Sequence, residues 1–142
     1  MPDRILVPFD GSPLAERALE HAVESFPEST ITALYVVNPV DSLLAVEAHG
    51  APVAGSWYED EQERADAFLA TAADLVADRG VAVETATATG QPIHEILDYA
   101  DEHGTDQIVV GSHGRDGVER AILGSVAETL VRRARVPVTV VR

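Results

Sequence analysis

Apolar residues in this chain follow two different periods, and the regular alternation of the two periods is the strongest constraint on its fold. Five short runs rich in apolar and β-branched residues have the character of strands; they cover residues 4–9, 30–37, 81–88, 106–110 and 136–141. Between them lie four longer segments in which apolar residues recur at helical spacing. Strands that alternate with helices favour right-handed crossovers and a parallel sheet. The sequence therefore predicts an α/β fold, a five-stranded parallel sheet with helices on both faces.

Local signals predict where the first two helices begin. Ser12 and Pro13 form a favourable pair of N-cap and first helical residue. Ser56 and Glu59 have the spacing of a capping box, which predicts that the second helix begins there. The segment from Asn38 to Gly55 contains two prolines and two glycines and is predicted to be a long loop, with room for a short helix over 42–48. Loops of this length are uncommon in compact domains unless they serve a function.

Length and composition favour a small cytoplasmic protein. A chain of 142 residues is expected to form one domain, here 1–142. The sequence has no cysteine, which excludes disulfides and thiolate metal sites. No apolar run approaches the ~20 residues that span a bilayer, and the N-terminal residues lack the pattern of a signal peptide. We therefore expect a cytoplasmic location and no membrane partner.

The charge of the chain is strongly negative. Asp and Glu number 24 against 10 cationic residues, all of them Arg, which gives a formal net charge of -14. The electrostatic field of so negative a chain repels nucleic acid, so neither DNA nor RNA is expected as a partner. An acidic surface without Lys resembles that of proteins from salt-loving organisms, in which salt screens the repulsion between carboxylates. We expect this chain to be halophilic and more stable in concentrated salt.

A glycine-spaced segment follows the fourth predicted strand. Gly111-Ser112-His113-Gly114 is separated by nine residues from Gly124-Ser125, which begins the last predicted helix. Glycine lets the backbone approach a ligand closely, and a helix N-terminus attracts anions. Ligands of parallel sheets bind at the carboxyl ends of the strands, which here directs attention to the residues after the first, second and fourth strands. The residues alone are equally compatible with a phosphate site and with a turn that leads into an ordinary N-cap.

Three motifs spread along the chain resemble those of the universal stress protein family. They are the opening ILVPFDGSPLAERALEHA, the turn TGQP-x-x-x-I from Thr89 to Ile96, and GSHG followed after nine residues by GSV. The glycine spacing is typical of the nucleotide-binding branch of that family. The resemblance implies a Rossmann-like three-layer sandwich of the adenine-nucleotide α-hydrolase-like type. It also implies a homodimer, with ATP or another adenine nucleotide as the ligand.

The resemblance also implies roles for individual residues, beginning with the base and the ribose. Pro8 and Val36 would line the adenine slot, with main-chain groups of Val36 offered to the base edge, and Val110 would pack nearby. Asp10 would face the ribose or the metal-phosphate region. An aspartate in Asp-Gly-Ser is also a common turn residue, so a purely structural role is the alternative for Asp10.

The remaining implied roles concern the phosphates. Gly111 and Gly114 would wrap the ribose and phosphates. Backbone N–H groups at Gly124, Ser125 and Val126, together with the Ser125 hydroxyl, would face the phosphate oxygens. Arg115 lies inside the same loop, where an arginine can pair with a phosphate but can equally be solvated.

The sequence offers no set of residues that indicates catalysis. It has no Walker A motif, no G-x-S-x-G elbow and no paired acid and base. We therefore expect no catalytic residues and no protein-caged metal, although Mg²⁺ or Mn²⁺ can accompany the nucleotide through its phosphates. The alternatives are a slow ATPase or phosphotransferase, and a dimeric interaction module that does not bind nucleotide.

The last predicted strand, 136–141, is apolar and lies at the end of the chain, which suggests an edge position in the sheet. An uncovered apolar edge is prone to pair with other strands. The resemblance implies that the same strand of a second subunit covers it across a two-fold axis. The alternative is that the strand only completes the sheet of a monomer.

Overall fold

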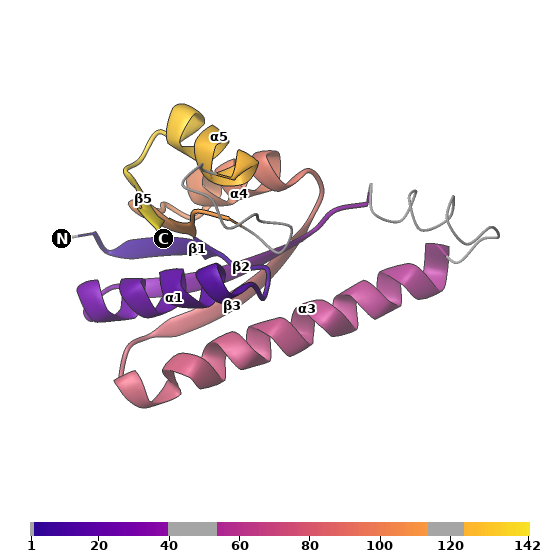
Figure 1. The fold of residues 1–142 in the computed structure, drawn as a ribbon, viewed down its shortest axis with the longest axis horizontal. Helices are drawn as coiled ribbons and strands as arrows, with labels where there is room; N and C mark the ends of the chain where they lie inside the picture. The colour runs from indigo at the N-terminus through magenta and orange to yellow at the C-terminus, as the bar shows by residue number, and fades with distance from the viewer. Residues whose placement is uncertain (1, 40–53, 114–123) are drawn as a thin grey trace.

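A parallel sheet of five strands forms the centre of the molecule (Figure 1). The computed structural model describes residues 2–39, 54–113 and 124–142. The strands are β1 (Arg4–Pro8), β2 (Thr30–Val37), β3 (Val83–Thr89), β4 (Gln107–Gly111) and β5 (Val138–Val141). Their order is β3-β2-β1-β4-β5, and each neighbouring pair is parallel. The predicted fold class is confirmed, and β5 lies at an edge of the sheet as expected.

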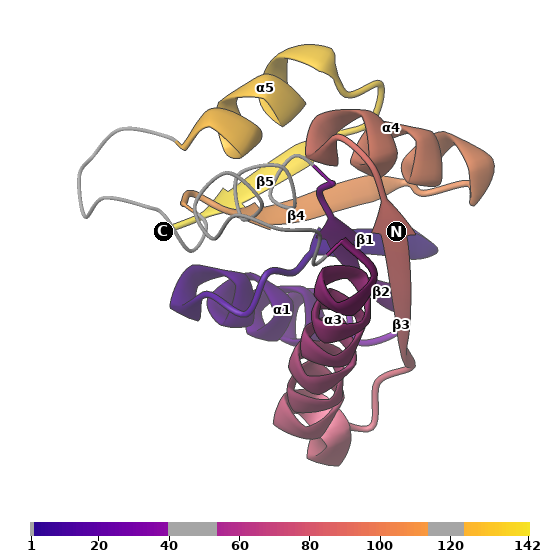
Figure 2. The ribbon, with the colours of Figure 1, turned by 90° about the vertical axis from the view of Figure 1, so that its right-hand side faces the viewer.

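Helices cover both faces of the sheet, as the alternation predicted. On one face lie α1 (Pro13–Ser25) and α3 (Ala54–Val76), which continues into the short 3-10 helix η1 (Ala77–Arg79). On the other face lie α4 (Pro92–Glu102) and α5 (Ser125–Arg133) (Figures 1 and 2). In the part of the chain that the structure describes, no helix has the length and apolarity needed to cross a membrane.

The central strand β1 shows why the sheet needs helices on both sides. Its apolar residues alternate between the faces, with Ile5 and Val7 in the core under α1 and α3 and Leu6 in the core under α4 and α5. All three are buried. Strands that are buried on both faces appear in the sequence as nearly continuous apolar runs, which is how β1 could be recognised.

Two predicted boundaries are wrong. Helix α3 begins at Ala54, so Ser56 lies inside the helix and is not the N-cap of a capping box. No proline lies between Pro52 and Ser56 to stop the helix from extending toward its N-terminus, and propagation of a formed helix adds residues at little cost. The predicted long loop therefore ends before Ala54, and its stretch 40–53, with the suggested short helix, lies outside the described residues.

The edge strands are also shorter than predicted. Strand β5 begins at Val138 because Pro137 has no N–H to donate to the ladder, although its carbonyl accepts from Ile108 at 3.0 Å. The Ala82 carbonyl accepts a hydrogen bond from the N–H of Ile31 in β2, and strand β3 begins at the next residue, Val83.

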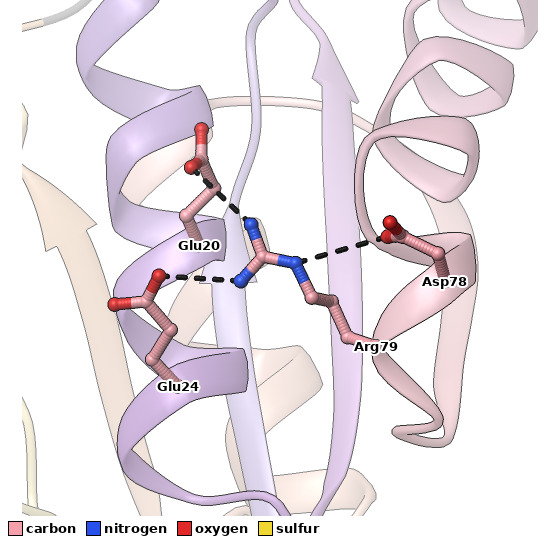
Figure 3. A network of polar contacts seen from close by, with 4 residues as sticks. All are labelled: Glu20, Glu24, Asp78 and Arg79. Carbon is pink, nitrogen blue, oxygen red and sulfur yellow. Dashed lines mark hydrogen bonds and ion pairs between the residues drawn. The ribbon is translucent and has the colours of Figure 1, made fainter.

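A cationic side chain joins the end of α3 to α1. Figure 3 shows the guanidinium of Arg79 between carboxylates on its two sides. Its nitrogens lie 3.2 Å from Glu24 and 3.9 Å from Glu20, both on α1, and 3.7 Å from the neighbouring Asp78. This cluster lies where α1 ends and β2 begins, at the opposite end of the sheet from the carboxyl ends of the strands. It fixes α3 against α1 away from the candidate site.

Candidate functional site

The carboxyl ends of three strands lie side by side at one edge of the sheet. Strand β1 pairs with β2 in a register that places Pro8 opposite Leu34, and with β4 in a register that places Leu6 opposite Ile108. The chain winds from β1 outward to β2 and β3, and then returns to the other side of β1 with β4 and β5. The reversal of winding therefore falls between β1 and β4, which is where sheets of this kind bind ligands.

Three of the predicted base-contacting residues share one face of this edge. Leu6, Leu34 and Ile108 all belong to the core beneath α4 and α5. Side chains of a strand alternate between faces, so the residues two positions further on face the same side. They are Pro8, Val36 and Val110, at the ends of β1, β2 and β4.

The same core also reaches the beginning of α5. Val36, Val110 and Val126 all pack in it, Val126 from the first turn of α5. Val110 is buried, whereas Val36 and Val126 are half-buried. The structure therefore brings these three predicted residues together in one apolar wall between the sheet and α5.

The turn after β1 carries Asp10. Its Oδ1 accepts a hydrogen bond from the backbone N–H of Ser12 at 3.0 Å, and the Ser12 hydroxyl oxygen accepts from the Ala15 N–H at 3.2 Å. Ser12 is therefore the N-cap of α1, as predicted, and the turn-forming role of Asp10 is observed. The bond orients the carboxylate at the carboxyl end of β1, beside the reversal point.

Hydrogen bonds place the two described ends of the glycine-spaced segment, Ser112 and Gly124, beside each other. The N–H of Ser112 donates to the Val141 carbonyl of β5 at 2.7 Å, and the Ser112 carbonyl accepts from the N–H of Gly124 at 2.6 Å. Ser112 and Gly124, which flank residues 113–123, are thus held next to each other by a hydrogen bond. The predicted ligands Gly114 and Arg115 lie outside the described residues.

The loop delivers the chain directly into α5. Gly124 is the N-cap of this helix, and Ser125 is its first residue, with an exposed side chain. The N–H groups of the first helical turn have no partner within the helix, and the helix dipole makes this end attractive to anions. The N-terminus of α5, which lies beside Ser112, therefore presents N–H groups of the kind that bind anions.

Both described glycines of the segment have a steric reason to be glycine. A Cβ on Gly124 would lie 2.8 Å from the carbonyl oxygen of Ser112, and a Cβ on Gly111 would lie 3.0 Å from the Leu14 backbone of α1. Gly124 is needed for the close contact that shuts the loop. Gly111 is needed for the approach of α1 to β4, a packing role that the sequence did not reveal.

Two further residues near the site were not assigned by sequence reasoning. Ser112 is buried and supplies the carbonyl that closes the loop. Phe68 of α3 packs against Gly11, in the turn that carries Asp10. Helical periodicity places Phe68 on a buried face but gives no information about the segment that it meets.

Electrostatics within the described ranges give little sign of acid–base or metal chemistry at this edge. No three His, Asp or Glu side chains among the described residues converge as metal ligands. Burial raises the pKa of Tyr99 on α4, and the Glu84 carboxylate raises it further, while a hydrogen bond with Thr32 and the charge of Arg4 lower it. These partners of Tyr99 lie in the amino-terminal halves of their strands, away from the candidate site.

Comparison with known proteins gives consistent matches over the whole chain. A family model described as the universal stress protein family matches residues 1–142. The chain is 33% identical over 144 residues to universal stress protein MJ0531 of Methanocaldococcus jannaschii, covering 98% of this chain and 81% of that protein.

Solved structures agree with this match. Universal stress protein UspA from Lactobacillus plantarum superimposes with a TM-score of 0.82 at 31% identity, covering 98% of this chain and 97% of that one. A universal stress protein from Archaeoglobus fulgidus, solved in complex with dAMP, has the same fold, with a TM-score of 0.69 at 22% identity. That alignment covers 100% of this chain and 98% of the other.

Proposed function

This chain belongs to the universal stress protein family, and we propose that it binds ATP or a related adenine nucleotide at the carboxyl edge of its sheet, as a regulatory module in the stress response. The observation that carries the proposal is the Gly124–Ser112 hydrogen bond, which joins the end of β4 to the N-terminus of α5. This arrangement lies beside the Asp10 turn, at the reversal of the strand order. The dAMP complex of the Archaeoglobus fulgidus relative supports an adenine nucleotide as the ligand.

In the proposed complex the base and ribose occupy the strand ends. The base packs on the side chains of Pro8, Val36 and Val110, with main-chain groups of Val36 at its polar edge. Asp10 faces the ribose or the metal-phosphate region. Its bond to the Ser12 N–H holds the carboxylate in place before the nucleotide arrives, which reduces the ordering required on binding.

The phosphates occupy the loop and the beginning of α5. They receive N–H groups from Gly124, Ser125 and Val126, and the Ser125 hydroxyl, while Gly111 and Gly114 allow the backbone to approach and Arg115 supplies a positive charge. Mg²⁺ or Mn²⁺ accompanies the nucleotide through phosphate oxygens. These residues can hold a nucleotide through apolar contacts, hydrogen bonds and charge, and none of them has to act as a general base or a nucleophile.

We assign no catalytic residue, and the protein acts by holding the nucleotide. The competing function is slow ATP hydrolysis or phosphoryl transfer. A turnover assay with ATP and Mg²⁺ separates the two, because release of phosphate at a rate dependent on Asp10 or Arg115 would favour the enzyme.

Calorimetry with ATP tests the binding site. Ser125→Leu places an apolar side chain where the phosphates bind, and we expect its affinity to fall at least about tenfold because the anion loses a hydroxyl and gains an apolar neighbour. Ser25→Leu is the matched control, the same change at an exposed position at the end of α1, on the opposite side of the molecule. Binding that is unchanged in Ser125→Leu refutes the site.

We also propose that the protein is a homodimer through β5. Among the described strands β5 has one neighbour, β4, and all four of its residues are half-buried. Its Pro137 and Val141 carbonyls bond to β4, so the alternation of a β-ladder leaves the N–H and C=O of Val138 and Val140 on the open edge. An antiparallel copy of the strand would satisfy those groups.

Light scattering tests the dimer. Val140→Pro removes an N–H from the open edge while leaving the bonds to β4, and proline is tolerated on the exposed side of an edge strand. We expect a dimer for the wild type and a monomer for Val140→Pro. A single species of 15.1 kDa in the wild type at micromolar concentration contradicts the proposal.

A further inference from the structure

We propose that Phe68 of α3 is a positioning residue for the nucleotide site. Its ring packs against Gly11, next to Asp10, and against Tyr35, next to Val36. The expected effect on the affinity for an adenine nucleotide rests on the proposed function. The structural content of the inference, that one side chain of α3 holds the Asp10 turn in place, can be tested without any ligand.

The first contact of Phe68 is with Gly11. A Cβ on Gly11 would lie 2.5 Å from ring carbons Cδ1 and Cε1 of Phe68, so the ring occupies the space that a side chain at position 11 would need. Gly11 has a φ of 81°, in the left-handed region that favours glycine. The ring therefore covers the backbone directly between Asp10 and Ser12, the two residues joined by the 3.0 Å bond of the turn.

The second contact of Phe68 is with Tyr35 of β2. The two rings are stacked with centroids 5.8 Å apart and an angle of 24° between their planes. Tyr35 is only 1% exposed and belongs to the core under α1 and α3, whereas its neighbour Val36 faces the core under α4 and α5. Phe68 thus meets β2 immediately before the residue proposed to contact the base.

The Asp10 turn needs such support. Glycine has more conformations to lose than any other residue, so a turn built on Gly11 has a larger entropic cost of ordering than one built on another residue. The bond from Ser12 to Asp10 lies in a part-buried position, where water competes for its donor and acceptor. Packing of the Phe68 ring excludes water and alternative backbone positions on the side of Gly11 that faces α3.

Other residues besides Phe68 hold helix α3 in place. Leu69, Ala72 and Val76 bury the same helix against the core, and Arg79 ties its end to α1. Truncation of Phe68 is therefore expected to leave α3 in place and to free the turn beneath it. Any nucleotide must then order the turn on binding, which lowers its apparent affinity.

The test compares Phe68→Ala with Leu75→Ala. Leu75 lies on the same helix and is partly buried against the same core, so Leu75→Ala is a matched control that also removes an apolar contact of α3. The first measurement is hydrogen exchange of the Ser12 amide in the protein without nucleotide. The second is the dissociation constant of ATP by calorimetry, well below the melting temperature of each variant.

We expect exchange of the Ser12 amide to be about tenfold faster in Phe68→Ala than in the wild type, and the dissociation constant for ATP to rise about tenfold. Leu75→Ala should change either quantity by less than about twofold. Equal effects in the two variants, or a Ser12 amide that is protected in Phe68→Ala as in the wild type, overturn the inference.

Two further outcomes are possible: Phe68→Ala does not fold, or the wild type does not bind ATP. If Phe68→Ala does not fold, Phe68→Leu keeps most of the apolar volume and removes the flat ring; unchanged Ser12 exchange in that variant overturns the inference, and faster exchange supports it. If the wild type binds no ATP, the proposed function fails, while the exchange measurement still decides whether Phe68 holds the turn.

Discussion

The close contact between Gly124 and Ser112 makes a specific prediction for Gly124→Ala. Gly124 has a φ of -64°, which any residue can adopt, so alanine at an unhindered position would stabilise the protein by roughly 0.4–1 kcal/mol through the unfolded chain. Here the new Cβ would lie 2.8 Å from the Ser112 carbonyl oxygen, which also accepts the Gly124 N–H at 2.6 Å. The methyl group cannot be accommodated unless this hydrogen bond lengthens or breaks.

The size of the effect follows from that bond. Loss of a hydrogen bond costs about 0.5–1.5 kcal/mol net, and more when a buried acceptor remains unsatisfied. We expect the free energy of unfolding to fall by about 1–2 kcal/mol and the melting temperature by roughly 3–8 °C for a chain of this length. Because the bond aligns the start of α5, the affinity for ATP should fall at least about tenfold.

Gly80→Ala is the control for the same substitution. Gly80 follows η1 with a φ of 71°, and a Cβ there meets nothing within 4 Å. Alanine at this position therefore pays only the left-handed backbone penalty of about 1–2 kcal/mol. Thermal melts and calorimetry should show similar destabilisation in the two variants but weaker ATP binding in Gly124→Ala alone. The reasoning is refuted if Gly124→Ala is at least as stable as the wild type and binds ATP equally well.

Changes at three other residues, and a change of salt, have expected outcomes. Asp10→Ala should lower the free energy of unfolding by about 1 kcal/mol, since it removes the acceptor of the Ser12 N–H, whereas Asp10→Asn keeps an acceptor and should weaken ATP binding with little loss of stability; urea unfolding and calorimetry measure the two effects. Arg79→Gln should destabilise the protein at low salt and less so in 1 M NaCl, because the ion pairs of Arg79 are partly exposed. The wild type should melt at a higher temperature in molar salt, because salt screens its net charge of -14. Burial raises the pKa of Tyr99, so its neutral form stabilises the fold fully below about pH 10 and this contribution disappears as the pH rises through the raised pKa. Tyr99→Phe should therefore lose less stability than the wild type in melts between about pH 9 and pH 11, and an equal loss would contradict the assignment.

The sequence was sufficient to predict the architecture because every element carries its own period. β1 and β4 are buried on both faces and appear as continuous apolar runs, and the helices are separated from them by residues such as Pro13, Pro92 and Gly104 that begin or end a helix. The beginning of α3 was not predictable in this way. A capping box at Ser56 is a local preference of about 1 kcal/mol, and the observed helix instead extends by three further residues, 54–56.

The candidate site was predictable only in part. The glycine spacing and the order of the elements located Gly124, Ser125 and the strand ends, because these depend on local chain geometry. The contact of Gly111 with Leu14 and that of Gly11 with Phe68 join segments far apart in the sequence, and apolar periodicity does not specify which buried residues meet. The hydrogen bond of Asp10 in the turn is visible only in the structure, whereas its role toward the ribose or phosphates stays a prediction.

The most direct test of nucleotide binding at this edge is a titration of the nucleotide-free protein with ATP and Mg²⁺, followed by backbone amide chemical shifts. The account predicts saturable shifts that are largest at Asp10 to Ser12, at Val36, at Ser112 and at Gly124 to Val126. It is contradicted if no amide shifts saturably, or if the largest shifts fall at the opposite end of the sheet, around Tyr99 and Glu84.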